Sequence, residues 1–100
     1  MNMNSENIDV LGQLLGCYFH QDWPDEFENA DQALQAIVER EPREQLIAGA
    51  KAIEALLEVE RSEEDWRTIM TDKIGCYFDP ESEGLTYAAW LRKVREAFRT

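Results

Sequence analysis

Every periodic stretch of this chain repeats its apolar residues at the 3.6-residue spacing of an α-helix, and this spacing constrains the fold more than any other feature. The clearest case is the C-terminal stripe, which consists of Tyr87, Trp90, Leu91, Val94 and Phe98. No segment reads as a β-strand, in which apolar and polar residues would alternate. The pattern therefore predicts an all-α fold.

Capping residues and prolines divide the chain into about five short helices. The first is expected from about Glu6 to Cys17, with Gly12 weakening it and Gly16 helping to end it. The other four are expected to begin near Asn29 or Asp31, Pro42, Ser62 and Thr86. Residues 21–31 include Pro24 and are expected to form a loop. One hundred residues suit a single compact domain, 1–100, whose residues 1–5 we expect to be frayed.

The chain carries a net charge of −11, from 21 acidic and 10 basic side chains. A field of that sign repels phosphate, which argues against binding nucleic acid or an anionic membrane. It favours a basic partner, although a purely solubilising role is an equal alternative. The basic residues at the C-terminal end are attributed to the helix dipole and to acidic partners elsewhere; they are Arg92, Lys93, Arg95 and Arg99.

The N-terminal residues lack the basic and apolar regions of a signal peptide. No apolar run reaches the roughly 18 residues of a membrane span. These observations predict a cytoplasmic protein whose two cysteines stay reduced.

The tetrapeptide Gly-Cys-Tyr-Phe occurs twice, at 16–19 and at 75–78, and each copy leads into an acidic loop that contains proline. A metal site made of Cys17, His20, Cys76 and Asp79 would be an unusual ligand set, and a Cys17–Cys76 disulfide does not suit a reducing compartment. We therefore expect buried thiols, with no metal and no cofactor. His20 is expected to hydrogen-bond a carbonyl or Asp22 and so hold its loop.

The two acidic loops supply the candidate partner-binding residues, which are Asp22, Asp25, Glu26, Glu28, Asp31, Asp79, Glu81 and Glu83. The first five surround Trp23 and Phe27 in a stretch without Lys or Arg. Such acid clusters steer basic partners, and buried aromatic residues supply affinity. The alternative is a solvated loop whose Trp23 covers the core, which we favour for Trp23 itself. The two groups would lie close together if the two tetrapeptides pack against each other.

Residues 16–22 resemble the Tyr-Phe-His-Gln-Asp signature of the CdiI-type immunity proteins of bacterial contact-dependent growth inhibition systems. The second half resembles the closing pattern of that family, here Gly75-Cys76-Tyr77, Asp79-Pro80, Gly84, Tyr87, Trp90 and Leu91. The resemblance covers about Ile8 to Phe98, nearly the whole chain.

This resemblance implies a cytosolic protein, not an enzyme, that binds and neutralises the C-terminal toxin domain of a cognate secreted effector. Such toxins are frequently nucleases. The motif residues are expected to define the scaffold rather than the toxin contacts, and no small-molecule substrate is implied. Two alternatives are kept: a small hydrolase using Cys17 and His20, and an acidic adaptor protein without a toxin partner.

Overall fold

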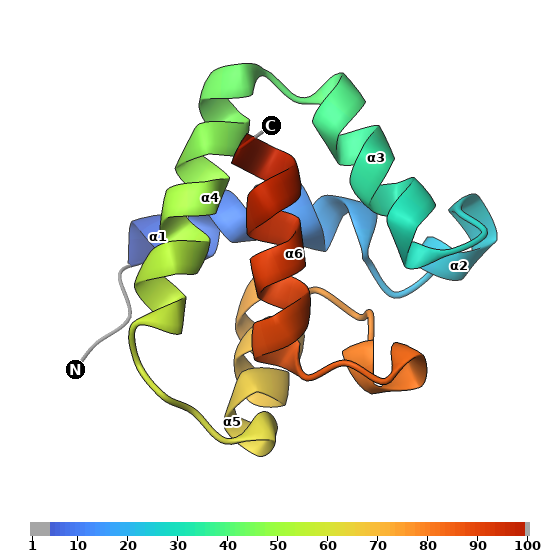
Figure 1. Cartoon of the computed structure of the whole chain (residues 1–100). Helices are drawn as coiled ribbons and strands as arrows, with labels where there is room; N and C mark the ends of the chain where they lie inside the picture. Colours follow the sequence, from blue (N-terminus) through green and yellow to red (C-terminus); the bar gives the residue numbers. More distant parts are fainter. Residues whose placement is uncertain (1–4, 100) are drawn as a thin grey trace.

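The computed structural model describes residues 5–99, and every regular element in that range is helical (Figure 1). The three longest helices are α3 (Ala30–Arg40), α4 (Arg43–Leu57) and α6 (Tyr87–Arg99). The structure confirms the all-α fold that the periodicity predicts. It also confirms that the apolar residues form one hydrophobic core, as expected for a single domain.

Helix α6 is the central element of the fold, with α4 on one side and α3 on the other (Figure 1). The five residues of its predicted apolar stripe are each at most 4% exposed. Helix α1 (Ser5–Leu11) packs against α4 and crosses behind it in the view of Figure 1. The predicted core of the C-terminal helix is therefore confirmed, because its stripe is buried against the neighbouring elements rather than exposed to solvent.

Two helices continue into π-helical turns that pack against each other. Helix α1 runs into η1 (Gly12–Gly16), and α5 (Glu63–Thr68) runs into η2 (Ile69–Ile74). A Cβ atom on Gly16 would collide with the carbonyl oxygen of Ile74. The backbone stays helical at Cys17, so Gly16 permits this close approach rather than ending the helix. Gly75 does end η2, in the left-handed conformation that glycine adopts most easily.

The helix caps form largely where the sequence predicts them. The side chains of Asn29, Ser62 and Thr86 each accept a hydrogen bond from the backbone N–H three residues later, at 2.9, 3.1 and 3.0 Å. The prediction that residues 21–31 form only a loop is wrong, because a short helix, α2 (Trp23–Glu26), lies within it. Pro24 is tolerated in the first turn of α2, where a helix leaves its N–H groups unpaired.

Of the five residues expected to be frayed, 1–4 lie outside the described residues, and Ser5 opens α1. Within residues 5–99, no helix combines the length and the apolar character needed to cross a bilayer.

Candidate partner-binding site

The two Gly-Cys-Tyr-Phe copies pack against each other. The backbone N–H of Tyr77 donates a hydrogen bond of 2.7 Å to the carbonyl oxygen of Phe19. The rings of Phe19 and Phe78 have centroids 5.8 Å apart, and Trp90 of α6 contacts both, at 5.3 and 4.9 Å. The repeated sequence thus forms a single aromatic cluster, in which each copy supplies its phenylalanine.

Trp23 joins this cluster and ties both acidic loops to it. Its ring lies 5.4 Å from Phe19 and 5.8 Å from Phe78, edge to face in both cases. Trp23 is the first residue of α2, and Phe78 lies two residues before the short 3₁₀ helix η3 (Pro80–Glu83). Both acidic segments therefore start from one aromatic cluster and lie on the same side of the molecule (Figure 1). Trp23 is half-buried, in agreement with the interpretation that it covers the core.

We call the eight candidate carboxylates of these segments the acidic rim: Asp22, Asp25, Glu26, Glu28, Asp31, Asp79, Glu81 and Glu83. All eight side chains are exposed. Three of them lie near a basic side chain, in the pairs Glu26–His20 at 3.1 Å, Asp31–Lys93 at 2.8 Å and Glu81–Arg67 at 3.7 Å. The other five make no ion pair within residues 5–99. Exposed pairs of this kind contribute little to stability, so the rim remains available to a partner.

Two cations approach the rim, and their partners there could not be identified from the sequence. Lys93 belongs to α6 and Arg67 to α5, and neither is near the acidic segments in the sequence. The stretch before Arg40 is free of Lys and Arg in sequence, but folding brings Lys93 to Asp31. The acidity of the rim is consequently strongest away from these two pairs.

His20 holds the first acidic segment, as predicted. Its Nδ1 accepts a hydrogen bond of 3.1 Å from the backbone N–H of Asp22, and its Nε2 lies 3.1 Å from Glu26 Oε2. Both ring nitrogens are thus engaged within the segment, and neither is paired with Cys17. The geometry gives no support to a Cys-His catalytic pair.

The two cysteines are free thiols in different environments: Cys76 is buried and Cys17 is exposed. The prediction of buried thiols is therefore right for Cys76 and wrong for Cys17. Leu15 and Phe19 occupy the core-facing positions of their helical turn, which leaves Cys17 on the outer side. Burial raises the pKa of the Cys76 thiol to about 12. No group of three or more potential ligands for a metal ion is present in residues 5–99.

Comparison with known proteins agrees with this architecture. The family model described as CdiI immunity protein matches residues 7–98. A chain in the crystal structure of a CdiA-CT/CdiI complex from Y. kristensenii 33638 is 27% identical, with a TM-score of 0.83, over 92% of this chain and 98% of that chain. No curated protein matches. The family match runs from within α1 to the last turn of α6 and includes both tetrapeptides, and this chain belongs to the CdiI immunity protein family.

Proposed function

We propose that this protein binds the C-terminal toxin domain of a CdiA effector and neutralises it by stoichiometric binding. The observation that carries the proposal is the family match over residues 7–98. The similarity to a chain of a CdiA-CT/CdiI complex supports it, because that structure contains a CdiA-CT partner. The protein acts by occupying a surface of the toxin, in the cytoplasm of the cell that it protects.

The acidic rim is the surface that we assign to this contact, and the toxin is a nuclease with a basic cleft. A cleft that holds phosphate groups presents Arg and Lys side chains, and carboxylates can take the place of the phosphates. The rim offers eight exposed carboxylates, five of which make no ion pair within the described residues. The net charge of −11 adds long-range attraction for a basic partner.

The test is to express this chain together with the toxin domain encoded by the effector gene directly upstream. We expect the two to elute as a 1:1 complex and the chain to restore growth to cells that make the toxin. A toxin domain from an unrelated effector is the control, and it should neither co-elute nor be neutralised. Absence of both complex and protection with the cognate domain would overturn the proposal.

Titration separates this proposal from the hydrolase alternative. A binding inhibitor protects only when it is at least equimolar with the toxin, whereas an enzyme protects at a small fraction of that amount. We therefore expect residual toxin activity to fall linearly and to reach zero at one equivalent. The toxin domain alone should degrade RNA or DNA, and a domain that degrades neither would remove the nuclease part of the proposal.

A further inference from the structure

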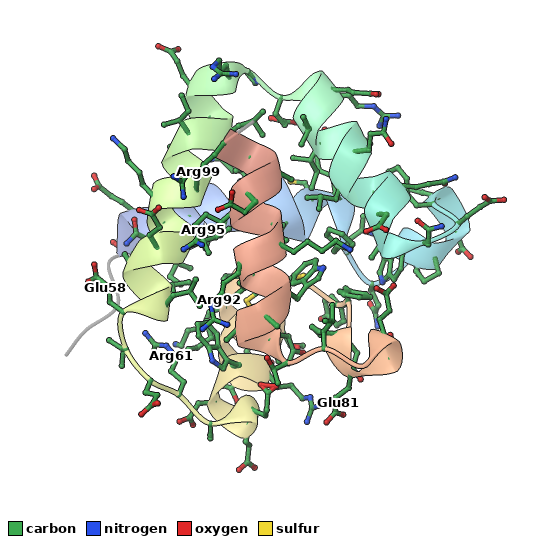
Figure 2. The ribbon with its side chains drawn as sticks, in the orientation of Figure 1. Glu58, Arg61, Glu81, Arg92, Arg95 and Arg99 are labelled. Carbon is green, nitrogen blue, oxygen red and sulfur yellow. The ribbon has the colours of Figure 1, made fainter. Side chains whose placement is uncertain are left out.

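One face of this acidic protein carries a row of arginines. Figure 2 shows Arg99, Arg95, Arg92 and Arg61 one below another along the side of α6 that is next to α4. The first three follow helical spacing on α6, and Arg61 comes from the segment between α4 and α5. Four of the ten basic side chains thus lie in one row, in a chain with a net charge of −11.

The upper half of the row is paired internally. Nη2 of Arg95 and Nη1 of Arg99 lie 3.5 and 3.4 Å from the same oxygen, Oε2 of Glu96. Arg99 also lies 3.4 Å from the carboxylate of Glu54. These two guanidinium groups already have carboxylate partners on the protein itself.

The lower half of the row differs, because Arg61 and Arg92 form no ion pair within residues 5–99. The guanidinium carbon of Arg61 lies 5.3 Å from the ring centroid of Trp66, in a cation–π contact. The Nε of Arg61, like that of Arg95, is buried and has no hydrogen-bond partner in the described part of the chain. A buried donor without a partner is costly, so a ligand that accepts a hydrogen bond here would be favoured.

Both arginines line a hollow of about 200 Å³. Its apolar wall includes Leu57 and Val59, and Val59 is 37% exposed. Trp66, beneath Arg61, contributes to the same hollow. The hollow therefore places two cations beside an aliphatic surface, which suits a ligand with a methylene chain and an anionic end.

We propose that this hollow receives a carboxylate side chain of the bound toxin domain. The proposal rests on the function proposed above, and it adds a second contact of opposite charge to the acidic rim. A planar guanidinium matches a carboxylate with two parallel hydrogen bonds. Glu60 also borders the hollow, and its negative charge disfavours a multiply charged free phosphate more than a single carboxylate.

A contact of each sign would fix the orientation of the toxin domain. A basic partner attracted to the acidic rim can dock in many orientations, whereas an acid that must enter the arginine hollow selects one of them. Figure 2 shows Glu81 of the rim and the two arginines of the hollow in the same view of the molecule. The toxin surface should accordingly carry an acidic residue outside its basic cleft.

The experiment measures binding of the toxin domain to Arg92→Gln and Arg92→Glu. Arg92 is exposed, so both variants should fold, which thermal unfolding checks. The matched control is Lys51→Gln, which removes the same charge from α4 at a hollow shared with α1. We expect Arg92→Gln to weaken binding by about 10-fold or more, mostly through faster dissociation, and Lys51→Gln by less than about 2-fold.

The expected direction of the change in affinity distinguishes loss of a local contact from an effect of the net charge. Arg92→Gln makes the protein more acidic, which should strengthen long-range attraction to a basic toxin. Weaker binding can then come only from loss of a local contact. Arg92→Glu should weaken binding further, and an acid-to-lysine change at the matching toxin residue should restore it.

Three outcomes would overturn the inference. If Arg92→Gln and Arg92→Glu bind as tightly as Lys51→Gln while the native chain binds at 1:1, the hollow is not a contact and the proposed function stands. If inorganic phosphate binds the free protein and depends on Arg92, with toxin affinity unchanged in Arg92→Gln, the hollow serves a small anion instead. If the native chain does not bind the toxin domain, both the inference and the proposed function fail.

Discussion

Cys17 and Cys76 occupy the same position in the two tetrapeptides, yet one is exposed and the other is buried. Each copy uses its phenylalanine in the aromatic cluster, with Phe19 and Phe78 both at most 3% exposed. The backbone of the first copy is helical at Cys17, whereas Cys76 of the second copy lies after the end of η2. The cysteine side chain therefore points in a different direction relative to the phenylalanine in each copy, because successive side chains rotate differently along helical and non-helical backbone.

This difference predicts selective thiol chemistry. At neutral pH, iodoacetamide should modify Cys17 in the native protein and leave Cys76 unmodified, as peptide mass spectrometry can show. Cys17→Ser should abolish native labelling, and Cys76 should react only after unfolding. Modification of Cys76 at the rate of Cys17 in the folded protein would contradict the burial of the Cys76 thiol.

The raised pKa of Cys76 also predicts a loss of stability in alkaline solution. Burial raises this pKa from its ordinary value of 9.0 to about 12, so the folded state keeps the proton that the unfolded state releases. The resulting contribution to stability is complete below pH 9 and is lost as the pH rises towards 12. Urea unfolding at pH 8 and pH 10.5 should show a larger decrease for the native chain than for Cys76→Ala. Equal decreases would indicate that the thiol is not the group responsible.

At the scale of elements, the close contact between η1 and η2 requires glycine at position 16 but not at position 12, at the other end of η1. A Cβ on Gly16 would meet the backbone oxygen of Ile74, which cannot move like a flexible side chain. A Cβ on Gly12 would lie 3.6 Å from that same oxygen, an ordinary contact distance. The two glycines therefore form a matched pair in one π-helical segment.

Gly16→Ala should decrease the free energy of unfolding by about 1–3 kcal/mol, as overpacking of a close contact typically does. Gly12→Ala should change it by no more than about 1 kcal/mol and can be stabilising, because alanine favours helical backbone over glycine. Chemical denaturation of both variants gives the comparison. Equal stability in the two variants would show that η1 and η2 are not packed this closely.

Much of the element level could be predicted from the sequence, because capping and periodicity are local. Asn29, Ser62 and Thr86 are caps in the structure, and the stripe around Trp90 is the core. The π-helical turns could not be predicted, because one extra residue in a turn leaves most of the 3.6-residue pattern intact. Helix α2 was missed because Pro24 reads as a helix breaker until its place in a first turn is known.

At the scale of the whole molecule, the sequence shows which side chains are charged but not which of them lie close together in the fold. The carboxylates of the acidic rim were chosen from composition and local sequence, and the structure brings their two segments to one aromatic cluster. Their role in binding stays a prediction. Arg61 and Arg92 were not predicted to share a hollow, because they are far apart in sequence and only the packing of the folded chain brings them together.

The acidic rim should increase the rate of association with the toxin domain because its carboxylates lie at the contact, and not only because they add to the net charge. The test replaces three rim residues together, Asp25→Asn, Glu26→Gln and Glu28→Gln. The control replaces three exposed carboxylates of α3, α4 and η2, Glu39→Gln, Glu44→Gln and Asp72→Asn. Each set changes the net charge from −11 to −8, so the two variants lose the same charge from different places.

At low salt, the rim variant should associate with the toxin domain about 10-fold more slowly than the control variant, because attraction near the contact steers docking most strongly. Raising the ionic strength to about 0.5 M shortens the screening length to a few ångströms, so the difference between the variants should shrink. Thermal midpoints of the two variants should stay close to that of the native chain, since these side chains are exposed. Stopped-flow measurement at the two salt concentrations decides the matter. Equal association rates for rim and control variants at low salt would move the contact away from α2, leaving the carboxylates of η3 as the next residues to replace.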